Sequence, residues 1–234
     1  MKKNPGFISF LKGHPIPAGQ STPISKIKLT ILMLIAMLVV NTLVAGLQMM
    51  LLRWGITQPI RSSGGIPEYM KDMPRYRIVL EIVLLAPLME ETAFRGILQN
   101  NERWFRIALA SLAYLITCRI FGLNFYELSW PTTGILFAAS LLLFIRKKYT
   151  TEIIDAKNRT PFRLILIWLS AIAFGFWHYY NFDFSQAGII TVAVSLMPFI
   201  INGLLLSYVA VKNGLSWSIL LHVANNAWPM VLWF

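Results

Sequence analysis

Long apolar stretches constrain the fold of this chain more than any other feature of its sequence. A helix that crosses a bilayer needs about 20 mostly apolar residues. We expect a helix in each of these stretches: Ile27–Leu52, Ile78–Gln99, Trp104–Leu123, Pro131–Ile145, Arg163–Tyr180, Gly188–Val211 and Leu215–Phe234. The fourth stretch is the shortest. The sequence therefore predicts an all-α, polytopic membrane bundle with about seven transmembrane helices.

The composition agrees with a membrane-embedded chain. The 234 residues are 56% hydrophobic and 13% charged, whereas soluble domains average about 25% charged residues. We expect a basic N-terminal tail, residues 1–26, and a single transmembrane domain, residues 27–234. We expect that the tail is not a cleavable signal peptide, because the apolar run behind it is too long. Its segment Phe7–Leu11 is compatible with a re-entrant or an interfacial position. The single cysteine, Cys118, excludes an internal disulfide and a cysteine metal cluster.

The net charge of +11 comes from basic residues that lie between the apolar stretches. This distribution is typical of membrane topology and argues against nucleic-acid binding. If the stretches alternate in direction, four connections on one side carry Lys2, Lys3, Lys12, Lys26, Arg103, Arg106, Arg146, Lys147, Lys148, Lys157, Arg159 and Lys212. One connection on the other side carries Arg53, Arg61, Lys71, Arg75 and Arg77. The larger number of basic connections on the first side predicts an N-in/C-out protein, whose basic side meets the anionic cytoplasmic leaflet. The short, lysine-rich chain favours a bacterial plasma membrane.

Ionisable and amide side chains are rare within the apolar stretches, and each is a candidate functional group because burial in lipid is costly. They are Glu81, Glu90, Glu91, Arg95, Arg119, His178, Asn202, His222, Asn225 and Asn226. On a helix, residues four apart share a face. The spacing therefore predicts an ion pair between Glu91 and Arg95, and it turns Glu90 about 100° away from Glu91.

The same spacing recurs at two other places. His222 and Asn226 share a face and offer two hydrogen-bonding groups, and Phe174 lies beside His178. Pro87 precedes Glu90 by one turn, and Pro229 lies in the last stretch. Each proline removes a helix hydrogen bond, and bent helices at buried polar sites are how membrane proteins form water-accessible cavities.

Each of these features alone has a structural explanation. The ion pair can be a packing interaction, His178 can be an interfacial residue, and the asparagines can join neighbouring helices. Glu81 and Arg119 are expected to be structural or to reach the interface. A free carboxylate, two imidazoles and an amide, all in helices that must pack together, favour a catalytic site instead.

Three short motifs resemble those of the CPBP family, the CAAX proteases and bacteriocin-processing intramembrane proteases. EETAFR at 90–95 resembles the EExxxR motif, FGFWH at 174–178 the FxxxH motif and HVANN at 222–226 the HxxxN motif. The resemblance covers residues 78–228. The chain departs from the usual pattern because two further apolar stretches and a basic connection separate the first two motifs. In the predicted topology His178 also lies nearer the outer surface than Glu90 and His222.

The resemblance implies hydrolysis of a peptide bond in a membrane-associated protein or peptide. On its motifs, Glu90 and His178 would activate a water molecule, and His222 and Asn226 would stabilise the oxyanion. Glu91, Arg95 and Phe174 would support these four residues. The sequence identifies neither the substrate nor the oligomeric state.

Zinc is the alternative to a metal-independent mechanism. A catalytic zinc takes three protein ligands and a water molecule, and Glu90, His178 and His222 could supply that set, although no HExxH motif is present. The resemblance is compatible with a metalloprotease and with a glutamate protease. We favour no cofactor, because the nearby Arg95 cation disfavours the binding of a dication.

Two functions of other classes compete with proteolysis. A non-catalytic membrane protein could keep the fold and bind a peptide, as in bacteriocin immunity, but the chain retains Glu90, His178, His222 and Asn226. A transporter could use buried carboxylate and imidazole groups as a proton relay. No inverted repeat is evident, and the polar groups gather in one predicted site.

Overall fold

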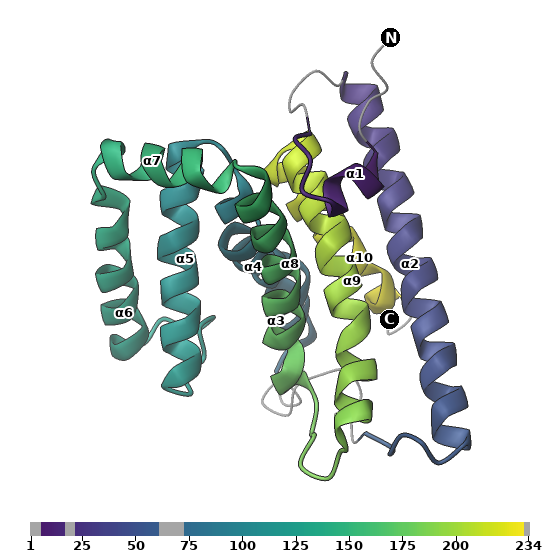
Figure 1. Cartoon of the computed structure of the whole chain (residues 1–234). Coiled ribbons are helices and arrows are strands. Elements are labelled where there is room, and N and C mark those ends of the chain that lie inside the picture. The colour runs from purple at the N-terminus through teal and green to yellow at the C-terminus, as the bar shows by residue number, and fades with distance from the viewer. Residues whose placement is uncertain (1–5, 17–21, 61–72, 232–234) are drawn as a thin grey trace.

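The computed structural model describes residues 6–16, 22–60 and 73–231, and all the regular secondary structure in these residues is helical (Figure 1). The helices are α1 (Phe7–Leu11), α2 (Pro23–Arg53), α3 (Arg75–Val79), α4 (Ala86–Phe94), α5 (Glu102–Ile120), α6 (Trp130–Ser140), α7 (Lys147–Lys157), α8 (Thr160–Trp177), α9 (Ile189–Asn213) and α10 (Leu215–Val231). The π-helical turn η2 spans Leu80–Leu85, and short 3-10 turns are η3 (Gly96–Leu98), η4 (Leu141–Phe144) and η5 (His178–Asn181). The predicted all-α fold is confirmed.

Three helical segments in the described part of the chain are long and apolar enough to cross a bilayer: Pro23–Arg53, Thr160–Asn181 and Ile189–Asn213. The apolar segment Trp130–Phe144 is shorter than these three. It corresponds to the predicted stretch Pro131–Ile145, which was also the shortest. Every predicted stretch contains helix, and the protein is membrane-integral. The number of about seven transmembrane helices stays a prediction.

The stretch that carries Glu90 is an interrupted helix. Residues 75–94 form α3, the π-helical turn η2 and α4 in succession, and Pro87 lies in the first turn of α4. Proline has no N–H to close the regular i→i−4 hydrogen bond, and a π-helical turn is one way for a helix to absorb such a break. The interruption predicted at Pro87 is therefore present, in the form of a wide turn that ends one helical turn before the acidic pair.

Two helices form where the sequence indicated a tail and a loop. Helix α7 occupies the basic connection and lies across one end of the bundle, near the ends of α5 and α8 (Figure 1). Its buried residues Thr150, Ile154 and Lys157 follow helical spacing, a periodicity that the charges concealed. Helix α1, for which the sequence left a re-entrant or an interfacial position open, packs against α9: Phe10 is 1% exposed, and its ring lies 5.4 Å from that of Tyr208 in α9.

Helix α9 is central to the packing around the site. It contacts α2, α8 and α10, and Figure 1 shows α2, α9 and α8 side by side. Two glycines permit the close approach of α8 and α9. A Cβ on Gly175 would lie 2.3 Å from Ile200, and a Cβ on Gly203 would lie 3.1 Å from the Ala171 backbone and 3.2 Å from the Arg95 guanidinium. Helix α8, which carries the FxxxH motif, also contacts α4, which carries the EExxxR motif.

Candidate active site

The predicted ion pair between Glu91 and Arg95 is confirmed. Arg95 Nη1 lies 3.3 Å from Glu91 Oε1, and both side chains are fully buried. Arg95 Nη2 donates to the Gly203 carbonyl at 3.3 Å, and its guanidinium carbon lies 3.9 Å from the centroid of the Phe174 ring. Arg95 therefore joins α4 to α8 and α9, and it also neutralises the carboxylate of Glu91.

Glu91 also binds two side chains of α10. Ser218 Oγ donates to Glu91 Oε2 at 2.5 Å, and His222 Nδ1 lies 3.0 Å from Glu91 Oε1. Because a carboxylate only accepts, Nδ1–H of His222 is the donor. Sequence reasoning missed Ser218, although it precedes His222 by four residues and so shares its face. Glu91 thus fixes the orientation of the His222 ring.

Glu90 faces a different environment from its neighbour. Trp177 Nε1 donates to Glu90 Oε1 at 3.2 Å, and Glu90 Oε2 lies 4.0 Å from His222 Nε2. Glu90 also lines a cavity of about 710 Å³. Trp177 was not predicted as a site residue, and only its position beside His178 could have indicated it. The two adjacent carboxylates therefore have different environments. Glu91 is surrounded by hydrogen-bond donors, and Glu90 borders the cavity.

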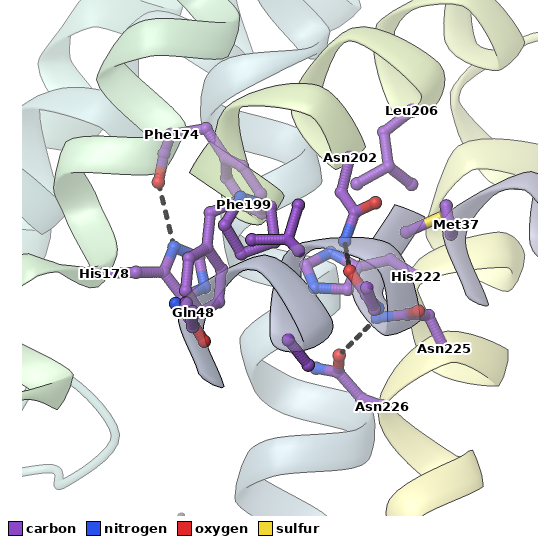
Figure 2. A pocket seen from close by; sticks show the side chains of 14 residues that line it. Met37, Gln48, Phe174, His178, Phe199, Asn202, Leu206, His222, Asn225 and Asn226 are labelled. Atoms are coloured by element: carbon purple, nitrogen blue, oxygen red, sulfur yellow. Dashed lines mark hydrogen bonds between the residues drawn. The ribbon is translucent and has the colours of Figure 1, made fainter. Parts of the chain in front are cut away.

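His178 begins the 3-10 turn that follows α8, and its ring packs between aromatic side chains (Figure 2). The imidazole stacks on Phe199 at 4.2 Å and lies 4.7 Å from the Phe174 ring, which is 5.6 Å from His222. The ring Nδ1 lies 2.9 Å from the Phe174 carbonyl and must be its donor. In the neutral ring, Nε2 then holds the lone pair. The end of α8 thus brings His178 against the same phenyl ring as His222.

Asn226 and Asn202 join helices. Asn226 Nδ2 donates to the carbonyl of Ile82 in the π-helical turn at 3.0 Å, so α10 is held against η2. Asn202 Nδ2 donates to Asn41 Oδ1 of α2 at 2.9 Å (Figure 2). Asn202 therefore joins α9 to α2, as expected for a packing residue. Asn226 lies at the site and leaves one amide N–H for another acceptor.

Two cavities share the candidate residues. One, of about 200 Å³, is lined by Phe174, His178, His222 and Asn226 among others (Figure 2). The other, of about 710 Å³, is lined by Glu90, Arg119, Trp177, His178 and Asn226 among others. His178 and Asn226 border both. Each of the four predicted catalytic residues therefore borders at least one of the two adjoining cavities: Glu90 borders the larger one, His222 the smaller one, and His178 and Asn226 both.

Glu81 and Arg119 are the other two charged residues that the sequence placed within the apolar stretches, and their surroundings differ. Glu81 is 3% exposed and pairs with Arg77 at 2.9 Å, which is a structural contact within one helix segment. The guanidinium of Arg119 lies over the rings of Trp177 and Tyr180, at 4.2 and 4.8 Å from their centroids. These contacts are compatible with the expected structural role, and Arg119 also borders the larger cavity.

A metal site would need three converging donors. Across residues 6–16, 22–60 and 73–231, no three His, Cys, Asp or Glu side chains are grouped so that they could hold a metal ion. Glu90, His178 and His222 therefore do not form a ligand set in this arrangement. His222 Nδ1 is directed to Glu91, whose other partners include the Arg95 cation.

The comparison with protein families shows the class of this protein. The family model described as type II CAAX prenyl endopeptidase Rce1-like matches residues 74–156 and 143–228, more than half of the chain. The chain belongs to this family. The CAAX-type endopeptidases are membrane-integral hydrolases with membrane-associated protein or peptide substrates, and the predicted resemblance is confirmed. The curated proteins and the solved structures contain no significant match to the chain.

Proposed function

We propose that this CAAX-type endopeptidase hydrolyses a peptide bond with a water molecule activated by Glu90 and His178. The supporting observation is the division between the two carboxylates. Glu91 accepts from Ser218 and His222 and pairs with Arg95, whereas Glu90 borders the larger cavity together with His178. A base must reach the proton that it abstracts, and Glu90 is the carboxylate placed to meet water and substrate.

His222 and Asn226 stabilise the oxyanion in this proposal. With both ring nitrogens protonated, His222 donates from Nδ1 to Glu91 and presents Nε2–H to the reacting group. Asn226 uses one amide N–H for the Ile82 carbonyl and offers the second. Two donors fixed by neighbouring helices are suited to a developing negative charge, since such donors need no reorganisation during the reaction. Glu91, Arg95 and Phe174 position the rings.

The reaction proceeds without a metal in this proposal. Arg95 supplies the positive charge that balances Glu91, and a dication beside it would be repelled. The alternative is a zinc protease with Glu90, His178 and His222 as ligands. That alternative requires these three side chains to move together, and it predicts loss of activity on chelation.

The proposed topology is a bundle of about seven transmembrane helices, N-in and C-out, in a bacterial plasma membrane. The N-terminal end of α2 lies at the same end of the bundle as α7 (Figure 1), and α7 carries the basic residues Lys147, Lys148 and Lys157. Basic residues favour the cytoplasmic side. In this orientation, residues 1–26 form the cytoplasmic segment that precedes the transmembrane domain at 27–234.

The test is cleavage of a quenched peptide library by purified protein, with wild type and Glu90→Ala compared with and without a chelator. We expect cleavage by wild type that survives the chelator and is lost in Glu90→Ala. Loss on chelation with recovery on added zinc would replace the proposal by the zinc mechanism. Absence of cleavage by both proteins would favour the non-catalytic, peptide-binding function.

A further inference from the structure

The smaller cavity is lined by two amide side chains, those of Asn202 and Asn225, that the proposed mechanism does not use. Asn202 lies in α9 and is 6% exposed, and Asn225 lies in α10 directly before Asn226. Figure 2 shows both amides at the cavity together with His222. Residues of α2 form another part of the wall, and Glu90 borders only the larger cavity. The smaller cavity therefore extends from the proposed oxyanion donors to α2.

The oxygen end of each of these two amides is an unpaired acceptor. Asn202 Nδ2 donates to Asn41 Oδ1 at 2.9 Å, and Asn225 Nδ2 lies 3.5 Å from Asn226 Oδ1. Within residues 6–16, 22–60 and 73–231, the buried Oδ1 atoms of Asn202 and Asn225 have no hydrogen-bond partner. A buried acceptor without a donor is costly, and folded proteins contain few of them. The two oxygens therefore indicate a ligand that supplies hydrogen-bond donors.

The charge of the smaller cavity restricts what this ligand can be. Among the described residues, those that line the cavity include no Asp, Glu, Lys or Arg. A carboxylate would face two unpaired amide oxygens, which are acceptors like itself. A cationic side chain would find no counter-ion, and it would meet the His222 ring, which carries both protons in the proposed mechanism. The chemistry of the cavity therefore fits a neutral donor, either a hydroxyl group or a primary amide.

We propose that the smaller cavity binds one uncharged, hydrogen-bonding side chain of the peptide substrate, that of Ser, Thr, Asn or Gln, and so selects the bond that is cleaved. The inference rests on the proposed function. Pockets for drug-sized ligands begin at about 300 Å³, so a cavity of about 200 Å³ suits a single side chain. Because His222 and Asn226 line the same cavity, the selected side chain lies next to the scissile bond. Asn202 and Asn225 are thus specificity-determining residues that accept hydrogen bonds from it.

Binding is measured with full-length protein in detergent that carries Glu90→Gln to prevent turnover. The probes are pools of fluorescent octapeptides, and each pool fixes one residue at one position. Matched pairs are compared at that position: Thr with Val, Asn with Leu and Gln with Met. The members of a pair are similar in volume, but only the first donates a hydrogen bond. At one position we expect the donor of at least one pair to bind roughly 10- to 100-fold more tightly, because its apolar partner leaves the two acceptors unpaired.

Substitution of the two asparagines separates this interaction from general peptide binding. Asn202→Leu should reduce the preference to below about 3-fold, because it removes one of the acceptors. Asn225→Leu should do the same, and it serves if thermal unfolding shows that Asn202→Leu is not folded. Asn213→Leu is the matched control and should keep the full preference. Asn213 also lies in α9, donates to the Lys26 carbonyl of α2 at 3.2 Å and has a buried Oδ1 without a partner in the described chain, but it lines neither cavity.

The cleaved bond gives a second measurement. Wild-type protein is incubated with the same pools, and mass spectrometry of the products locates the bond. We expect the selected residue to adjoin that bond. Failure of the proposed function has a different signature from failure of the pocket: wild type would cleave no pool, or Glu90→Gln would cleave at the wild-type rate, while the preference and its loss in Asn202→Leu remained.

Three results would overturn the inference. The first is the absence of the preference at every position, which includes the absence of peptide binding. The second is a preference that folded Asn202→Leu or Asn225→Leu leaves unchanged, or that Asn213→Leu removes to the same extent. The third is a selected residue that does not adjoin the bond cleaved by wild type.

Discussion

Two adjacent residues on one helical turn, Glu90 and Glu91, have different surroundings at this site. Glu91 is enclosed by Arg95, Ser218 and His222, which come from two helices. Glu90 instead meets the Trp177 indole and the cavity. Because consecutive residues on a helix point about 100° apart, a pair of glutamates can supply one structural carboxylate and one that is accessible to substrate.

Arg95→Lys tests the positioning part of this division. Lysine keeps the positive charge but lacks the planar fork that reaches Glu91 and the Gly203 carbonyl together. We expect kcat to fall roughly 10- to 100-fold, with KM for the peptide little changed. Arg106→Lys, on the partly exposed face of α5, is the control. Wild-type kcat in folded Arg95→Lys would remove the positioning role.

Residue spacing predicted part of this site and missed part. The i, i+4 rule identified Glu91 with Arg95, and it grouped His222 with Asn226. It did not identify Trp177 as a donor to Glu90, because that contact joins helices that are distant in sequence. Ser218 could have been found by extending the His222 spacing one turn back. A serine in an apolar helix, however, usually has a structural explanation.

At the scale of elements, small residues set the distance between helices. Gly203 faces the Ala171 backbone and the Arg95 guanidinium, where an added Cβ would lie at 3.1 and 3.2 Å. These distances are tighter than ordinary van der Waals contact, so α8 and α9 can pack closely only with glycine at this position. Helix–helix association in membranes depends on such close approach.

Gly203→Ala should separate α8 from α9 and displace Arg95. We expect the free energy of unfolding to fall by about 1–3 kcal/mol and kcat to fall with it. Gly46→Ala in α2 is the matched control, because no atom lies within 4 Å of its added Cβ. Thermal unfolding in detergent measures both variants. Equal stability of Gly203→Ala and wild type would show that the close approach is dispensable.

Helix α7 is held to the turn after Arg95 by Lys157, whose Nζ donates to the carbonyls of Ile97 and Gln99 at 2.8 and 2.6 Å. Helix α7 lies outside the candidate spans. Burial, reinforced by the Arg163 charge, lowers the pKa of Lys157 from 10.5 to about 7. Between these two pH values the unfolded chain binds more protons at this position than the folded chain. Stability should therefore rise with pH over that range.

Lys157→Met should remove this dependence on pH. We expect the difference in Tm between wild type and Lys157→Met to move in favour of wild type from pH 7 to pH 9. Below pH 7 the side chain is protonated in both states, so the difference should be constant there. Lys148→Met, at an exposed position in α7, should show no such trend. If the Tm of wild type minus that of Lys157→Met stayed constant or fell from pH 7 to pH 9, the lowered pKa of Lys157 would be contradicted.

Elements differ in how well the sequence predicts them. Apolar length predicted a helix in every stretch, and Pro87 predicted the interruption before Glu90. The π-helical turn could not be predicted, because the same proline is compatible with a simple kink. Helix α7 was missed because its charges dominate the pattern, and its buried stripe at Thr150, Ile154 and Lys157 has meaning only against α5 and α8.

At the scale of the whole molecule, the basic helix α7 and the larger cavity lie toward different ends of the bundle. The basic helix α7 and the start of α2 lie at one end (Figure 1). The larger cavity is lined by residues 122–127, which follow the far end of α5, by Trp177 at the end of α8 and by Tyr180 in η5. In the proposed orientation, the larger cavity therefore lies toward the extracytoplasmic end of the bundle.

Labelling of single cysteines tests this orientation. On a Cys118→Ala background, Trp54→Cys and Lys148→Cys place exposed thiols at opposite ends of the bundle. In intact bacterial cells, a membrane-impermeant maleimide should label Trp54→Cys and should reach Lys148→Cys only after permeabilisation. The reverse pattern would invert the topology and place the larger cavity on the cytoplasmic side.

The central claim is that Glu90 and His178 act together on one water molecule. The most direct measurement is kcat/KM for wild type, Glu90→Gln, His178→Ala and the double variant on the same peptide. Residues that act as a unit are strongly non-additive. We predict that each single variant loses about a thousandfold or more and that the double variant loses no more than the worse single variant. The claim would be contradicted if the loss of kcat/KM in the double variant equalled the product of the two single losses, or if Glu90→Gln kept near wild-type turnover.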